Sequence, residues 1–262
     1  MTLVLDVGNT HTTVALFDGP VLLRSWRLST ARHRTSDEWG ALMKNLFHIH
    51  DLDMGSVTGI AISSVVPPAD APLREMCRQY LGKEPLFVVP GVKTGLQIHY
   101  DNPTEVGADR VVNAVAVLAK YAVPAIVVDF GTATTFDMLD GEGAYLGGVI
   151  APGLGISSEA LFEKAAKLPK VEVVKPPRVI GKSTVVAMQS GLYWGYIGLV
   201  EGILKRMKRE FGPVKTVIAT GGLAPVLAKD CPSVDLTDEN LTLEGLRLLY
   251  ERNKGCEEIR KA

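Results

Sequence analysis

Short apolar runs alternate with turns of glycine, hydroxyl and acidic residues along the chain. Near the start, the apolar run 3–5 leads into Asp6-Val7-Gly8-Asn9-Thr10, and a second run covers 12–17. Glycine permits the backbone of a tight turn and asparagine tolerates it, so this pattern predicts a β-hairpin.

The same pattern returns in the second half of the chain. The apolar run 125–128 leads into Asp129-Phe130-Gly131-Thr132-Ala133-Thr134-Thr135, and aligning Asp6 with Asp129 also aligns Gly8 with Gly131. A weaker echo pairs the buried-type strands 59–65 and 216–222. Two halves with the same order of parts predict a duplicated α/β fold, in which mixed sheets are flanked by helices and the ligand lies between the halves. We place the halves at residues 1–120 and 121–262.

Helical periodicity fills the gaps between these strands. It predicts helices over 36–52, 103–121, 184–211 and 243–253. The locally basic segment 24–34 contains four arginines, and we interpret it as a solvated connection between a strand and a helix rather than a nucleic-acid surface.

The long helix predicted over 184–211 carries glycines on one stripe. They are Gly191, Gly195, Gly198 and Gly202, and each costs about 1 kcal/mol relative to alanine inside a helix. Close approach of another backbone would explain them. Two alternatives stay open, which are a neighbouring element of the same chain and the same helix of a partner subunit.

Composition excludes several classes of protein. A formal net charge of −1 gives no basic surplus for nucleic acid or an acidic membrane surface. The apolar runs are too short to span a bilayer, and the first apolar run contains Asp6 without a basic leader before it. The cysteines Cys77, Cys231 and Cys256 are odd in number and lack metal-type spacing, which favours a reducing cytoplasm.

The two hairpin turns are candidates for phosphate binding. A turn of glycine and hydroxyl residues presents backbone N–H groups to phosphate oxygens, and the Asp6 carboxylate could hold Mg²⁺ through water. Asp129 ends an otherwise apolar strand, where a buried charge needs a metal or hydrogen bonds. An ordinary polar turn is the alternative for each loop taken alone.

Two further motifs suggest substrate chemistry. The motif Gly107-Ala108-Asp109-Arg110 lies early in the helix predicted to begin near Pro103, where the dipole keeps the Asp109 carboxylate ionised as a general base. Arg110 could bind a substrate carboxylate or a phosphate. The glycines of Thr220-Gly221-Gly222 would let an adenine ring lie against the backbone. A surface Asp–Arg pair and a tight turn are the respective alternatives.

Together, the motifs at 6–10, 107–110, 129–134 and 220–222 resemble the signatures of the type III pantothenate kinases, in order and spacing, over nearly the whole chain. The resemblance implies ATP-dependent phosphorylation of pantothenate to 4'-phosphopantothenate, the first step of coenzyme A biosynthesis. It also implies the duplicated ribonuclease-H-like fold of the actin-like ATPases, and a homodimer with the helix 184–211 near its interface.

The resemblance assigns roles to individual residues. Asp109 is the proton acceptor, Asp129 binds a monovalent cation (K⁺ or NH₄⁺), and ATP is used with Mg²⁺. The expected ATP-binding residues, with the two adenine-site glycines included, are Asp6, Val7, Gly8, Asn9, Thr10, His11, Thr12, Thr13, Thr132, Gly221 and Gly222. The expected pantothenate-binding residues are Tyr100, Gly107, Ala108, Asp109, Arg110 and Thr184.

Two alternatives to this function stay open. One is another small-molecule kinase of the same fold. The other is a catalytically idle transcriptional regulator related to the family, which the presence of Asp6, Asp109 and Asp129 argues against because a binding module does not need all three.

Overall fold

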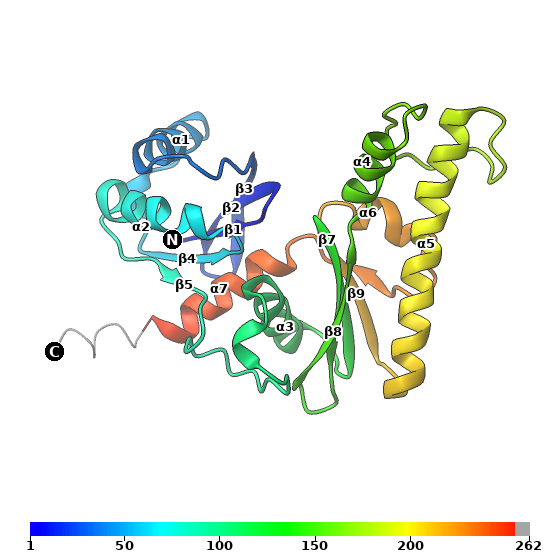
Figure 1. Ribbon diagram of the computed structural model, residues 1–262. Helices are drawn as coiled ribbons and strands as arrows, with labels where there is room; N and C mark the ends of the chain where they lie inside the picture. Colours follow the sequence, from blue (N-terminus) through cyan, green and yellow to red (C-terminus); the bar gives the residue numbers. More distant parts are fainter. Residues whose placement is uncertain (255–262) are drawn as a thin grey trace. The chain divides into compact units, whose positions relative to one another are not determined.

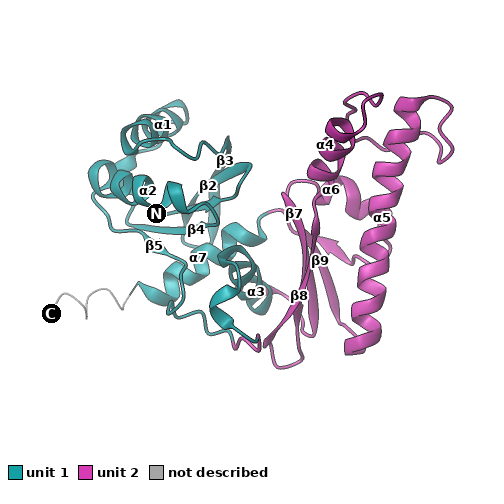
Figure 2. Cartoon of the chain, in the orientation of Figure 1, with its two compact units in different colours: residues 1–96, 101–119, 240–262 teal, residues 97–100, 120–239 magenta. Residues whose placement is uncertain are grey.

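The computed structural model describes residues 1–254, which form two compact units (Figure 2). Unit 1 contains residues 1–96, 101–119 and the C-terminal residues from 240, and unit 2 contains residues 97–100 and 120–239. Cys256 lies outside the described residues. Within residues 1–254, no helix is both long enough and apolar enough to cross a membrane.

Unit 1 is built on a five-stranded mixed sheet (Figure 1). Its strands are β1 (Thr2–Val7), β2 (His11–Asp18), β3 (Val21–Ser29), β4 (Gly59–Ser64) and β5 (Leu86–Phe87), in the order β3-β2-β1-β4-β5. Strand β1 pairs antiparallel with β2 and parallel with β4. The predicted hairpin is therefore confirmed, and its turn lies at the carboxyl end of a central strand.

Helices cover both faces of this sheet because side chains alternate along β1. Leu3 and Leu5 pack with α1 (Ser36–Ile49) and α2 (Pro67–Leu81), while Val4 packs with α3 (Ala108–Lys120) and α7 (Leu241–Asn253). Short 3-10 helices, η1 (Met54–Ser56) and η2 (Pro103–Glu105), lie in the connections. The sheet is thus the middle layer of three.

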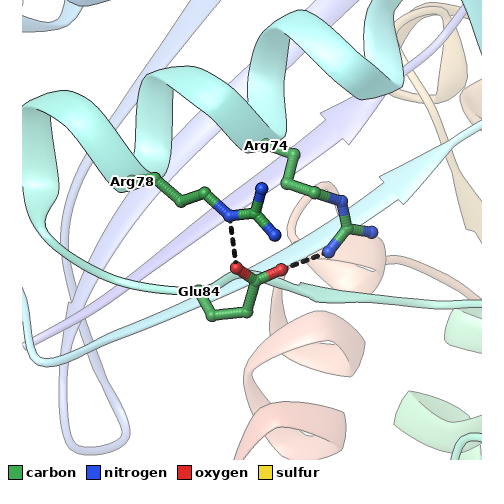
Figure 3. Close-up of polar contacts among 3 residues, drawn as sticks. All are labelled: Arg74, Arg78 and Glu84. Carbon is green, nitrogen blue, oxygen red and sulfur yellow. Dashed lines mark hydrogen bonds and ion pairs between the residues drawn. The ribbon is translucent and has the colours of Figure 1, made fainter.

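Local sequence determines where the first two helices begin and end. Thr35 caps α1 in a capping box, since its hydroxyl accepts from the Glu38 amide and the Glu38 carboxylate accepts from the Thr35 amide. Helix α2 ends at Gly82, which is left-handed with φ of 62°. Figure 3 shows Glu84 between Arg74 and Arg78, where it ties the last turns of α2 to the chain that enters β5.

Unit 2 repeats the topology of unit 1. Its strands are β6 (Ala125–Phe130), β7 (Ala133–Leu139), β8 (Tyr145–Pro152), β9 (Thr216–Thr220) and β10 (Leu236–Thr237), in the order β10-β9-β6-β7-β8. Strand β6 pairs antiparallel with β7 and parallel with β9, as β1 does with β2 and β4. The predicted duplication is confirmed by this shared order.

The helices of unit 2 are α4 (Leu154–Lys164), the long α5 (Thr184–Phe211) and the short α6 (Ala224–Leu227), followed by the 3-10 helix η3 (Ala228–Asp230). One face of the sheet packs on α5, where Tyr193, Tyr196 and Val200 meet Ile126 and Val128. The bounds predicted for α5 agree with the structure.

Some expectations differ from the structure. Arg24 and Arg27 lie on β3, so the segment predicted to be a connection is largely a strand, whose Trp26 is its one buried residue. The helix predicted over 103–121 is broken, since η2 ends at Glu105 and α3 begins at Ala108. Helix α7 packs within unit 1, although the sequence placed it in the second half. The division into halves at 1–120 and 121–262 stays a prediction.

Candidate active site

The turn between β1 and β2 is exposed at the end of the unit 1 sheet. Asn9, Thr10 and His11 are exposed, and the Gly8 amide donates a hydrogen bond to the His11 carbonyl at 3.0 Å. A Cβ atom added at Gly8 would lie only 3.0 Å from that same oxygen, so a side chain there would strain the turn. The sequence therefore places glycine where the backbone folds most tightly.

Asp6 stands beside this turn, one residue before the end of β1. Its neighbours across the sheet are Thr13 on β2 and Ser63 on β4. Residues 1–254 contain no group of three or more His, Cys, Asp or Glu that could hold a metal ion. The role of Asp6 in holding Mg²⁺ through water stays a prediction.

His11 begins β2 and is paired with an arginine. Its Nδ1 atom lies 3.1 Å from Nη2 of Arg27, and because a guanidinium can only donate, Nδ1 must accept. Burial and then the charge of Arg27 lower the pKa of His11. The ring is therefore neutral, with its proton on Nε2.

Asp129 occupies the equivalent place in unit 2, and its carboxylate lies close to two glycines. A Cβ atom added at Gly221 would lie 2.5 Å from Asp129 Oδ1 and 2.8 Å from backbone atoms of Phe130. One added at Gly131 would lie 3.6 Å from the same carboxylate oxygen. A carboxylate beside bare backbone offers the oxygen ligands that hard cations prefer.

The loop after Asp129 is held by the start of α4. Gly153 caps that helix, and its amide donates to the Thr132 carbonyl at 3.1 Å. A Cβ atom at Gly153 would lie 2.2 Å from the same oxygen, so only glycine permits this contact. Thr132 itself is exposed. The hydrogen bond between Gly153 and Thr132 was not predicted from the sequence.

Asp109 lies in the first turn of α3, because that helix begins at Ala108 and not near Pro103 as predicted. Its Oδ1 atom accepts from the Arg110 amide at 2.9 Å, and a Cβ atom at Gly107 would lie 2.5 Å from that oxygen. Burial raises the pKa of the Asp109 carboxyl, while the amide and the charge of the 6%-exposed Arg110 oppose the rise. A carboxylate with a raised pKa is better suited to accept a proton.

Tyr100 belongs to unit 2, in a short segment paired with the edge of β8. The His99 amide donates to the Tyr145 carbonyl at 2.8 Å, and the Tyr100 and Tyr145 rings lie 6.3 Å apart. A Cβ atom at Gly147 would approach the Tyr100 ring to 3.3 Å. Gly147 thus gives the ring a flat backbone surface to rest on.

The predicted site residues fall in both units. Unit 1 contains the turn 6–13 and the motif 107–110. Unit 2 contains Tyr100, Asp129, Thr132, Gly221 and Gly222. Thr184 is exposed as the first residue of α5, after the cap Ser183. Convergence of Asp6, Asp109 and Asp129 stays a prediction.

The fold and these loops define a class. Similar chains are a Campylobacter jejuni protein described as a Baf family transcriptional activator (TM-score 0.61, 18% identity, 97% of this chain and 99% of that one) and a Clostridium difficile dehydratase activator with bound ADPNP (TM-score 0.55, 14% identity, 100% and 97%). The chain has the duplicated ribonuclease-H-like fold of the actin-like ATPases and kinases.

Sequence comparison narrows this class to one family. The type III pantothenate kinase family model matches residues 2–206. Type III pantothenate kinases of Koribacter versatilis and Geobacter sulfurreducens are each 52% identical to this chain. The matches cover 97% of this chain and 96% and 100% of those proteins, respectively. The chain belongs to the type III pantothenate kinase family.

Proposed function

We propose that this chain transfers the γ-phosphoryl group of ATP to pantothenate, which gives 4'-phosphopantothenate in the first step of coenzyme A biosynthesis. The observation that carries the proposal is Asp109, a partly buried carboxylate with a raised pKa inside a family motif of a chain 52% identical to pantothenate kinases. The site supports phosphoryl transfer to a hydroxyl because such a reaction needs a base and a phosphate cradle.

In this mechanism, Asp109 accepts the proton of the primary hydroxyl of pantothenate. The freed oxygen lone pair forms a bond to the γ-phosphorus, and the bond from that phosphorus to the β-phosphate oxygen breaks, so ADP leaves with its electron pair. Arg110 binds the pantothenate carboxylate, while Tyr100, Gly107, Ala108 and Thr184 line the substrate. Removal of the general base should lower turnover by about 10²–10⁴-fold.

The two loops hold the nucleotide. Backbone amides of the turn 6–13 and of Thr132 face the phosphates, and Gly221 and Gly222 lie against the adenine. Mg²⁺ bound with the nucleotide, beside Asp6, would neutralise phosphate charge. Asp129 would hold K⁺ or NH₄⁺ through the oxygen atoms of its carboxylate, beside which the Gly221 backbone lies.

A homodimer and a cytoplasmic location complete the proposal. Cβ atoms added at Gly191, Gly195 and Gly198 would meet nothing within 4 Å, so within residues 1–254 no neighbouring element accounts for the stripe. This favours the partner-helix alternative, with Thr184 near the interface. Replacing Gly195 by leucine should improve helix propensity yet lower the sedimentation mass to that of a monomer. An unchanged mass would contradict the interface.

The test is ADP release with Mg·ATP and pantothenate in K⁺, NH₄⁺ or Na⁺ alone. Pantothenate-dependent turnover that requires K⁺ or NH₄⁺ supports both substrate and cation site. Asp109→Asn should abolish most turnover and leave ATP binding intact, while the matched control Asp101→Asn, an exposed aspartate, should behave as the parent. If Asp109→Asn loses ATP binding and turnover equally, the base assignment is wrong.

The regulator and other kinases are the competing functions. The Baf-type activator is 18% identical, which bears on the fold and not on activity. Absence of turnover with every cation, with Mg·ATP still bound, would favour another substrate or the regulator.

A further inference from the structure

The end of β3 lies beside the phosphate turn of unit 1. Strands β2 and β3 pair so that His11 faces Ser29 and Thr13 faces Arg27. The residues that follow Ser29 therefore lie at the turn end of the β1–β2 hairpin. They belong to the basic segment 24–34, to which the mechanism above gives no role.

Thr30 is bonded to this turn in three ways. Its hydroxyl donates to the Gly8 carbonyl at 2.7 Å and lies 2.9 Å from the Thr12 hydroxyl, and its amide donates to the Thr10 carbonyl at 3.0 Å. Two carbonyl oxygens of the turn are thus occupied. Because carbonyl oxygens repel a phosphate while amides attract it, these bonds favour a turn that accepts an anion.

Two arginines reach the same turn. Arg27 donates to His11 Nδ1 at 3.1 Å, and Arg32 donates to Asn9 Oδ1 at 3.3 Å. Both side chains are exposed, and within residues 1–254 neither forms a salt bridge with a carboxylate. Their positive charge therefore remains available to a ligand at the turn, and guanidinium groups are well matched to phosphate oxygens.

We propose that Thr30, Arg27 and Arg32 complete the polyphosphate site of ATP, Thr30 as a positioning residue for the turn and the two arginines as charge that favours the nucleoside triphosphate. This inference rests on the proposed function, because it deepens the ATP site of that reaction. The lowered pKa of His11 agrees with it, since a neutral ring beside Arg27 leaves the arginine as the cation.

The experiment compares Thr30→Val, Thr30→Ser, Arg27→Gln and Arg32→Gln with the control Arg24→Gln. Arg24 lies on the same strand but opposite Leu16, away from the turn. Steady-state kinetics should show KM for ATP raised about fivefold by each arginine change and about tenfold by Thr30→Val, with KM for pantothenate unchanged. Thr30→Ser keeps the hydroxyl and should restore parental kinetics.

Calorimetric titration measures the affinity for each nucleotide, and a merely structural role would not change the ranking of these affinities. Affinity lost in the arginine variants should be largest for Mg·ATP, smaller for ADP and smallest for AMP, since the arginines act on phosphate charge. Variants with the parental thermal midpoint but an equal rise in both KM values would overturn the proposal. So would an Arg24→Gln effect as large as the others.

Failure of the proposed function gives a different result. If the parent protein binds Mg·ATP but does not phosphorylate pantothenate, the substrate assignment fails while the titrations still decide the role of Thr30 and the arginines. If the parent is active and the variants match Arg24→Gln, only this inference is wrong.

Discussion

Replacing Gly221 by alanine is the sharpest test of the Asp129 site. Gly221 has φ of +88°, and its added Cβ atom would lie 2.5 Å from Asp129 Oδ1 and 2.8 Å from the Phe130 backbone. The carboxylate can rotate away, but the Phe130 backbone belongs to central strand β6 and cannot yield cheaply. The substitution therefore displaces Asp129 and strains the strand together.

The magnitude follows from two costs. A left-handed conformation costs an alanine about 1–2 kcal/mol, and overpacking in a well-packed region costs about 1–3 kcal/mol. We expect Gly221→Ala to lower the free energy of unfolding by about 2–5 kcal/mol. Since about 1 Å of misplacement in a site can cost about 100-fold in rate, turnover and its activation by K⁺ should fall by that order.

The assay is chemical unfolding combined with ADP release across a K⁺ titration. Gly91→Ala is the matched control, because Gly91 has a similar φ of +97° and nothing within 4 Å of its added Cβ. The free energy of unfolding of Gly91→Ala should fall by only about 1–2 kcal/mol, and its kinetics should match those of the parent. Parental stability and K⁺ response in Gly221→Ala, or equal losses in both variants, would refute the reasoning.

Three further predictions use the titrating groups. Asp109 must be ionised to act and its pKa is raised, so the acidic limb of kcat/KM should lie above the ordinary value of 3.8. Because ionisation of this partly buried group opposes folding, Asp109→Asn should raise the thermal midpoint at pH 7 but not below pH 3.8. An acidic limb at 3.8 would contradict this. Burial raises the pKa of Glu84, but the hydrogen bonds from Arg78 and Arg74 lower it by more. Glu84→Gln should therefore lower the free energy of unfolding in urea by about 0.5–1 kcal/mol, a loss that is constant above pH 4.5 and fades below it. No loss at pH 7 would count against the ion pairs. Burial raises the pKa of Cys77 and of Cys231 to about 12. In a Cys256→Ser background, both thiols of the folded protein should therefore react with a disulfide reagent at pH 8 at least about 100-fold more slowly than in urea. Rapid labelling of the folded protein would contradict their burial.

The sequence predicted the parts of the fold that depend on strong local patterns. Both hairpins were predictable because an apolar run, an aspartate and a glycine recur in the same order, and the structure gives β1 and β6 the same partners. Helix α5 was predictable because Ser183 caps it, Gly212 ends it and its apolar positions keep one period. The sequence also placed Asp109 early in a helix, although that helix begins at Ala108 and not near Pro103.

Strand β3 escaped prediction because it is mostly exposed. Arg24 and Arg27 flank the buried Trp26, so its composition resembles a solvated connection more than a strand. Helix α2 was missed because Pro67, Pro68 and Pro72 obscure its period, although the first two stand where a helix tolerates proline.

The role of Thr30 depends on register, which sequence alone does not fix. The pairing of β2 with β3 shifts between Leu16 and Phe17, where a bulge adds one residue to β3. A one-residue slip would move each β3 side chain to the opposite face of the sheet. The bulge thus places Arg27 opposite Thr13 and brings Thr30 to Gly8. No local sequence pattern in 24–34 predicts this bulge.

The duplication explains the fold, but the two loops have diverged in chemistry. Asp6 lies opposite Ser63 on β4, and Asp129 lies opposite Thr220 on β9, so Ser64 and Gly221 occupy equivalent places. The missing side chain at Gly221 lets backbone approach the Asp129 carboxylate, while a Cβ atom at Gly8 would meet only the His11 carbonyl. Backbone therefore lies close to the Asp129 carboxylate, at the place where we propose a monovalent cation. The turn after Asp6 instead has Thr30, Arg27 and Arg32 around it, which suit an anion. The two copies of the hairpin thus differ in their surroundings, because the residues that follow the neighbouring strands differ.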